Sequence, residues 1–343
     1  MLLNENEYLS IVNDIKNQII LAQQRATTWI NREMVVLYWN VGKTINDRKT
    51  WGDNFIVNLS RDIRSTFPNI RGFSERNLKY MAKFARIYTD FEIVQQVLHN
   101  LPWRHNIALM DKLDEESSRV WYAEQALENG WSSNVLEMQI ESGLYNRQVI
   151  ADKTTNFMAT LPAPQSDLAQ QTMKDPYIFD FIENRKDMVE RDLENELVSH
   201  IAKFLLELGS GFAFVGRQYH LEIGEKDFYI DLLFYNLKLR CYVVIELKMK
   251  EFIPEFAGKL NFYVSAVDDI LKQDTDNPTI GILLCRKKNK VIAEYALRHI
   301  ESPISVNEFK LFDKLPKEYE NILPTAEDIE SRLNLDVMSK NKD

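Results

Sequence analysis

Three residues in the second half of the chain carry side chains that could hydrolyse a phosphodiester bond. Asp231 lies inside the apolar run DFYIDLLFYN, and Glu246 and Lys248 end the apolar run CYVVIELK. A carboxylate within a buried strand is costly unless it has a partner, and residues two apart on a strand point to the same face. The spacing therefore predicts two carboxylates and an ammonium group at one place in a sheet.

These two runs predict a β-hairpin closed by the loop 237–240. Counting back from Asn236 paired with Cys241 places Asp231 opposite Glu246, and opposite residues in a ladder lie about 5 Å apart on one face. Two carboxylates so close repel each other unless a cation joins them, and such oxygen ligands suit Mg²⁺ or Mn²⁺. A divalent ion binds the scissile phosphate and activates water, while Lys248 orients that water or steadies the developing charge. The alternative is a structural ion-pair network.

Two further residues are predicted to lie near this site. Glu194 falls inside the apolar stripe of the helix that begins near Arg191, whereas Glu196 does not. A buried acid needs a partner, so we expect Glu194 to be a third metal ligand; the alternative is that it caps its own helix. Gln218, on the strand before the hairpin, could present its amide to water or phosphate near the same place.

Hydrophobic periodicity predicts the elements that must position these residues. The predicted order is αβββαβα, with helices at 190–208, 254–272 and 290–300 and strands at 212–223, 227–236, 241–249 and 279–286. We expect a mixed sheet in a domain spanning 190–315. A proline-interrupted connector at 151–189 precedes this domain, and a polar tail at 316–343 follows it.

The first 150 residues predict an all-α domain, so the whole chain is expected to be an α+β protein of two domains. The expected helices cover 5–39, 54–67, 74–89, 91–100, 105–111, 117–129 and 133–145, and Gly42 suits the end of the first. The helix capped by Ser74 is typical of the recognition helix of a helix-turn-helix unit.

A local excess of basic residues lies in this helical domain. Between Arg61 and Arg104 there are eight Lys or Arg residues against four acids. The candidates for nucleic-acid contacts are Arg76, Lys79, Arg86 and Arg104, and the alternative is an ordinary solvated face. A loop at 101–106 adds aromatic, guanidinium and amide groups that could contact phosphate or stack on bases. For Trp103, the alternative of a core residue is favoured.

Composition narrows the class of protein. A length of 343 residues suits two folded domains, and the net charge of −9 argues against a globally basic nucleic-acid binder. No window holds the roughly 18 unbroken apolar residues of a membrane helix, and the N-terminus lacks a signal-peptide pattern, so we expect a soluble, cytoplasmic protein that does not bind a membrane. Cys241 and Cys285 lie in apolar strands, which favours buried thiols over a disulfide or zinc site.

The residues above also carry a family resemblance. The segment Asp192–Ile300 resembles the PD-(D/E)xK nuclease core, with an acid on the first helix, Asp231 on the second strand and Glu246-Leu247-Lys248 on the third. The wording GFAFVGRQYHLEIGEKDFYIDLLFYNLKLRCYVVIELK is similar to the YhcG-like family of bacterial nucleases, and GFSERNLKYM, LPWRHN and PQSDLAQQ are similar to that family's amino-terminal domain. One departure is that Ile230, not proline, precedes Asp231.

This resemblance implies a restriction-endonuclease-like αβββαβ core and Mg²⁺-dependent cleavage of nucleic acid, most of all DNA, in DNA processing or defence. Asp231 and Glu246 would be metal ligands and Lys248 the catalytic lysine. Two alternatives stay open: a non-catalytic protein that binds nucleic acid or assembles a complex on a nuclease fold, and an RNA-directed nuclease. A cleft that spans a duplex would favour a homodimer.

Overall fold

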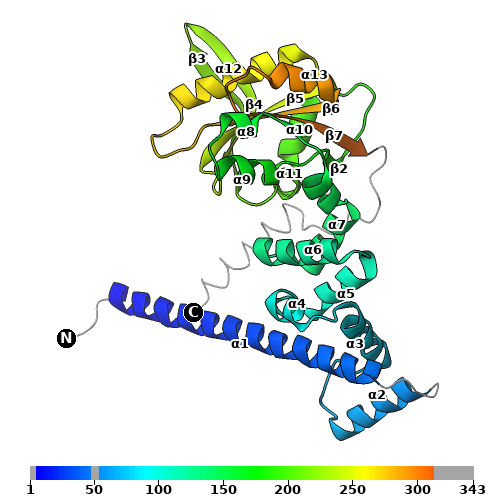
Figure 1. Cartoon of the computed structure of the whole chain (residues 1–343). Coiled ribbons are helices and arrows are strands. Elements are labelled where there is room, and N and C mark those ends of the chain that lie inside the picture. The colour runs from blue at the N-terminus through cyan, green and yellow to red at the C-terminus, as the bar shows by residue number, and fades with distance from the viewer. Residues whose placement is uncertain (1–4, 48–53, 313–343) are drawn as a thin grey trace. The chain divides into compact units, whose positions relative to one another are not determined.

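The structure is a computed structural model that describes residues 5–47 and 54–312 (Figure 1). The chain divides into two compact units, one up to Tyr145 and one from Asn146 onward. The predicted tail at 316–343 lies outside the described residues. Within the described ranges, no helix combines the length and the apolar character that a membrane span requires.

The first unit is helical, as the periodicity predicts. Its helices are α1 (Glu5–Asp47), α2 (Phe55–Thr66), α3 (Glu75–Ile87), α4 (Phe91–Gln96), the short 3₁₀ helix η1 (Leu98–Asn100), α5 (Trp103–Lys112), α6 (Glu116–Asn129) and α7 (Ser133–Glu141). Ser74 caps α3 by accepting a hydrogen bond from the Asn77 N–H, which confirms the predicted helix start. Gly130 ends α6 in the left-handed conformation that glycine favours.

Gly42 does not end the first helix. It lies within α1, where an added Cβ atom would stand only 1.9 Å from the carbonyl oxygen of Met81 on α3. The prediction of a helix end is therefore wrong, because the missing side chain serves the close approach of two helices.

The second unit is built around a mixed sheet in the order β1-β7-β6-β5-β4-β3, with β2 also paired to β7. Strands β3, β4 and β5 are antiparallel neighbours, and β5, β6 and β7 are parallel. The strands are β1 (Thr154–Thr155), β2 (Tyr177–Glu183), β3 (Phe212–Ile223), β4 (Lys226–Asn236), β5 (Cys241–Glu251), β6 (Ile280–Lys287) and β7 (Ile304–Phe312). Together with the helical unit, this sheet confirms the predicted α+β class.

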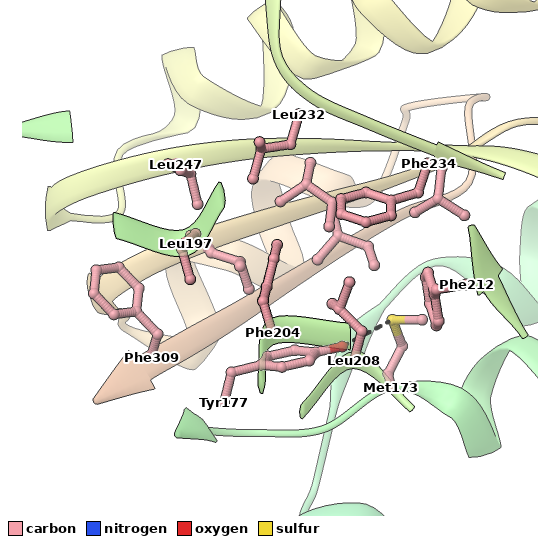
Figure 2. Close-up of a cluster of buried hydrophobic side chains, with 14 of the residues drawn as sticks. Met173, Tyr177, Leu197, Phe204, Leu208, Phe212, Leu232, Phe234, Leu247 and Phe309 are labelled. Carbon is pink, nitrogen blue, oxygen red and sulfur yellow. Dashed lines mark hydrogen bonds between the residues drawn. The ribbon is translucent and has the colours of Figure 1, made fainter. Parts of the chain in front are cut away.

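Helices cover both faces of this sheet. The strands are therefore buried on both sides, in agreement with their apolar sequences. The helices are the π-helical turn η2 (Asn146–Ile150), α8 (Phe157–Thr160), α9 (Gln165–Thr172), α10 (Glu190–Ser199), α11 (Ile201–Leu208), α12 (Pro254–Ile270) and α13 (Lys290–Leu297). One buried cluster joins α10 and α11 to the sheet through Leu197, Phe204, Leu232 and Leu247 (Figure 2). A second cluster joins α12 and α13 to the opposite face.

The prediction of a connector over 151–189 is wrong. This segment forms β1, α8, α9 and β2, and it contributes Met173 and Tyr177 to the cluster shown in Figure 2. Phe179 belongs to the same buried cluster. Strand β2 runs parallel to β7, which lies more than a hundred residues later in the chain. The prolines separate short helices and strands, and contacts with residues far away in the sequence stabilise these elements.

Two other details differ from the predicted order. The helix expected at 190–208 is two helices, α10 and α11, that meet at His200. Strand β7 has no counterpart in the prediction, and its buried face includes the polar Ser305 and Asn307. Strands β3 to β6 and helices α12 and α13 otherwise lie within a few residues of their expected positions.

Candidate active site

The hairpin of β4 and β5 has the register that the loop length predicts. Its pairs run from Asn236 opposite Cys241 to Leu232 opposite Ile245, so the ladder of paired residues stops one step before Asp231 and Glu246. The Asp231 carboxylate reaches β5 directly, because its Oδ2 accepts a 2.9 Å hydrogen bond from the Leu247 N–H. Asp231 therefore stands beside the Glu246-Leu247-Lys248 segment, as predicted.

Burial and a neighbouring charge perturb Asp231. Burial, followed by the charge of Glu246, raises the pKa of its carboxyl to about 6, although the Leu247 N–H and the ammonium groups of Lys248 and Lys259 act in the opposite direction. A carboxyl group whose negative charge is disfavoured by a second carboxylate is a candidate ligand for a cation.

Glu246 is the most enclosed group of the site. Its side chain is 0% exposed, and its Oε1 accepts hydrogen bonds from Lys248 Nζ at 2.8 Å and Lys259 Nζ at 2.5 Å. No described residue donates a hydrogen bond to its buried Oε2. A buried carboxylate oxygen without a partner is unfavourable unless something else binds there.

Lys248 faces the same side of the sheet as Glu246. Leu247, between them, belongs to the cluster on the α10–α11 face, so Glu246 and Lys248 point toward α12. The Lys248 ammonium also donates to the Leu247 carbonyl at 2.9 Å and lies 5.4 Å from the centre of the Phe256 ring.

Lys259 is a site residue that the sequence analysis missed. It comes from α12, whose residues Leu260, Tyr263, Val264 and Val267 are buried against the sheet. Burial alone would lower the pKa of the Lys259 ammonium, but the Glu246 carboxylate raises it above its usual value. The available signal was a lysine one turn before a buried tyrosine on an apolar helix, which helical periodicity places beside the buried stripe.

Gln218 joins the remaining carboxylates. Its Nε2 donates to Glu194 Oε2 at 2.5 Å and lies 3.4 Å from Asp231 Oδ1. Its backbone has a φ of +43°, within β3, where neighbouring residues pair regularly with β4. A non-glycine residue in this region costs about 1–3 kcal/mol and persists only where the surroundings enforce it. The strained backbone places the amide between Glu194 and Asp231.

Glu194 and Glu196 differ as the helical periodicity predicts. Glu194 is buried on α10, whereas Glu196 forms a surface ion pair with Arg185 at 2.8 Å. Glu194 is flanked by Leu193 and Leu197, which belong to the cluster on the α10–α11 face. It meets the other site residues through the Gln218 amide.

Carboxylate oxygens are suitable ligands for a divalent cation, and two of the site's carboxylates, Asp231 and Glu246, are candidates to bind one. Among the described residues, no three His, Cys, Asp or Glu side chains converge closely enough to form a metal cluster. Asp231 and the unpaired Oε2 of Glu246 nevertheless present the hard oxygen donors that Mg²⁺ and Mn²⁺ prefer. These two residues would hold the ion, whereas Glu194, predicted as a third ligand, is connected to Asp231 only through the Gln218 amide.

Comparisons with known proteins agree with this geometry. Residues 170–324 match the family model described as YhcG PDDEXK nuclease domain, and residues 14–147 match the DUF1016 N-terminal domain. The two units of this chain thus match domains of YhcG-like nucleases. The Escherichia coli (strain K12) protein named "Putative nuclease YhcG" is 29% identical over 91% of this chain and 92% of its own length.

Solved structures resemble this chain only distantly. A repair endonuclease from Pyrococcus abyssi is 16% identical over 38% of this chain, with a TM-score of 0.26. EndoMS in a complex described as EndoMS-dsDNA2 is 19% identical over 40% of this chain, also with a TM-score of 0.26. Each match covers 50% of the solved chain. Scores this low decide neither fold nor function.

The DUF1016 N-terminal domain carries the basic residues predicted to contact nucleic acid. Arg76, Lys79, Arg86 and Arg104 are all exposed. The first three recur at helical spacing on α3, and the Arg76 guanidinium lies over the Tyr80 ring at 5.7 Å from its centre. These positions leave the four side chains accessible to a partner.

The expected loop at 101–106 is mostly the beginning of α5. Trp103 donates to Asn77 Oδ1 at 2.7 Å and packs on Tyr38 and Phe84, while His105 and Asn106 are buried. Trp103 therefore packs against the core, which confirms its prediction as a core residue. The prediction that the Asn106 amide could contact nucleic acid is wrong, because that side chain is buried. The Arg104 side chain, in contrast to those of His105 and Asn106, is exposed.

Proposed function

We propose that this protein is a Mg²⁺- or Mn²⁺-dependent nuclease that hydrolyses phosphodiester bonds of DNA. The observation that carries the proposal is the meeting of Asp231, Glu246 and Lys248, with one buried Glu246 oxygen left without a hydrogen-bond donor. The match to a nuclease domain model supports the same reaction. DNA is the proposed substrate because α3 offers a row of exposed basic side chains to a phosphate backbone.

Each residue has a role that follows from its position. Asp231 and Glu246 would hold the divalent ion, which would supply a Lewis acid and a water of lowered pKa. Lys248, which already bonds Glu246 at 2.8 Å, orients the attacking water or stabilises the charge that develops on the phosphate. Gln218 keeps Asp231 and Glu194 apart and oriented by contacting both.

Purified protein incubated with supercoiled plasmid tests the proposal. We expect cleavage with Mg²⁺ or Mn²⁺ that EDTA abolishes, and a loss of about 100-fold or more in Asp231→Asn and Lys248→Met. Asp227→Asn is the matched control, because this exposed carboxylate lies on the same strand but pairs with His220. It should cleave at the wild-type rate.

The same assay separates the alternatives. Cleavage of a matched RNA in place of DNA would make the protein an RNA-directed nuclease. Binding of nucleic acid with no metal-dependent cleavage of either substrate would make it a non-catalytic protein with a nuclease fold. Cleavage that survives in Asp231→Asn would place the active site elsewhere.

A further inference from the structure

Two ammonium groups from different elements meet one oxygen of Glu246. Lys248 Nζ, from β5, and Lys259 Nζ, from α12, lie 2.8 and 2.5 Å from Glu246 Oε1. One ammonium group is enough to neutralise one carboxylate. Asp231 also acts on Lys259, so the second ammonium becomes available for another anion once a divalent cation offsets the carboxylates.

The two lysines differ in their surroundings. The Lys248 side chain is 12% exposed, and its ammonium also bonds the Leu247 carbonyl beside the Phe256 ring. The Lys259 side chain is 45% exposed, and its other neighbour is the Tyr263 ring, 5.1 Å away. Of the two lysines that bond Glu246, Lys259 is therefore the more exposed to solvent.

Helix α12 holds Lys259 in a defined place. An added Cβ atom on Gly281 of β6 would lie 2.9 Å from the side chains of both Leu260 and Val264, so the helix packs closely on the sheet. Leu260 follows Lys259 directly, and both Leu260 and Val264 are buried. A lysine anchored this way does not depend on a mobile loop for its position.

The charges at the site balance only when both lysines are counted. In their ionised forms, Glu194, Asp231, Glu246 and a phosphodiester carry four negative charges. A divalent cation and Lys248 supply three positive charges, and Lys259 supplies the fourth. Because charges are costly to leave uncompensated where water is excluded, this balance favours a phosphate bound beside Lys259.

We propose that Lys259 is a second active-site lysine that contacts a non-bridging oxygen of the substrate phosphate. The assignment rests on the proposed nuclease function and adds to it the residue that binds the reacting group. Lys248 acts on the attacking water, and Lys259 moves from Glu246 Oε1 to the phosphate when the substrate arrives.

Binding of a fluorescent DNA duplex by the full-length protein at increasing salt tests this role. Ca²⁺ replaces Mg²⁺, and a gel verifies that the duplex stays intact. Lys259→Met should weaken binding of different duplex sequences by a similar factor and lower the slope of log affinity against log salt by about 0.9, as one lost phosphate contact requires. Lys259→Arg should restore the slope, because it keeps the charge.

The control is Lys272→Met, which removes a lysine that follows α12 and lies 4.0 Å from Asp268. It should leave the slope unchanged, and circular dichroism should show all variants folded. An unchanged slope in Lys259→Met, or a wild-type protein that binds no duplex, would overturn the assignment. If the wild type binds but does not cleave with Mg²⁺, the proposed function fails while the slope comparison still decides the role of Lys259.

Discussion

At the scale of single residues, Asp231 is held where its ionised form is disfavoured. Burial and the charge of Glu246 raise its pKa from 3.8 to about 6. Between these values the folded protein retains a proton that the unfolded chain has released, so the contribution of this group to the free energy of unfolding falls as pH rises. Above pH 6 the ionised Asp231 therefore destabilises the ion-free site, and binding of a cation would remove this destabilisation.

Asp231→Asn should remove this strain in protein kept in EDTA. We expect the variant to be more stable than the wild type at pH 8, by up to about 3 kcal/mol, with the advantage disappearing near pH 4. Urea denaturation across this range measures the difference. Asp227→Asn should follow the wild-type profile, and an Asp231→Asn variant that is less stable at pH 8 would contradict the electrostatic account.

At the scale of elements, a buried ion network attaches the segment before β2 to helix α11. Glu207 accepts a 2.5 Å bond from Arg147 and a 2.8 Å bond from the Ile178 N–H, and the Lys174 ammonium bonds the Glu207 carbonyl. Burial, partly offset by Glu207, lowers the pKa of Lys174 to about 8. The network thus fixes β2 beside the cluster of Figure 2.

Removing the charge of Glu207 should therefore loosen this attachment. Glu207→Gln removes the carboxylate charge that faces the buried Arg147 and Lys174, and we expect it to lower the free energy of unfolding by about 3 kcal/mol or more. Chemical denaturation at pH 7 measures the loss. Glu196→Gln breaks only the exposed pair with Arg185 and should cost less than about 1 kcal/mol. Equal effects of the two substitutions would count against a structural role for the network.

At the scale of the whole molecule, each unit has its own hydrophobic core. Among the described residues, two buried clusters lie entirely before Asn146 and two lie entirely after it. Residues 157–182 supply part of one C-terminal cluster, including Phe157, Tyr177 and Phe179. The nuclease unit therefore begins well before the first helix of the motif that carries the chemistry.

Two fragments test this boundary. A fragment of residues 146–343 should unfold in one cooperative transition, because it contains both of its buried clusters. A fragment of residues 190–343 should lack that transition, since it loses β2 and exposes the apolar surface that Phe179 covers. Thermal unfolding followed by circular dichroism distinguishes them. A stable, cooperative 190–343 fragment would show that residues 146–189 are dispensable, as a connector would be.

Much of the site follows from local patterns. Alternation along two strands and a short loop are enough to bring Asp231 beside the Glu246-Leu247-Lys248 segment, because register in a hairpin depends on residues close in sequence. Helical periodicity is enough to separate buried Glu194 from exposed Glu196. The sequence by itself therefore determined the carboxylate pair, its neighbouring Lys248 and the two-unit α+β organisation.

The tertiary structure alone decided which distant groups complete the site. Lys259 reaches Glu246 from a helix packed across the sheet, Gln218 joins two carboxylates through a strained backbone, and β2 pairs with β7. Parallel strand pairs and helix-on-sheet contacts join residues far apart in the chain, and periodicity shows only that a residue is buried, not against what. The spacing of the sequence predicts Glu246 as a site residue. Its second ammonium partner, Lys259, could be identified only from the packing of α12 on the sheet.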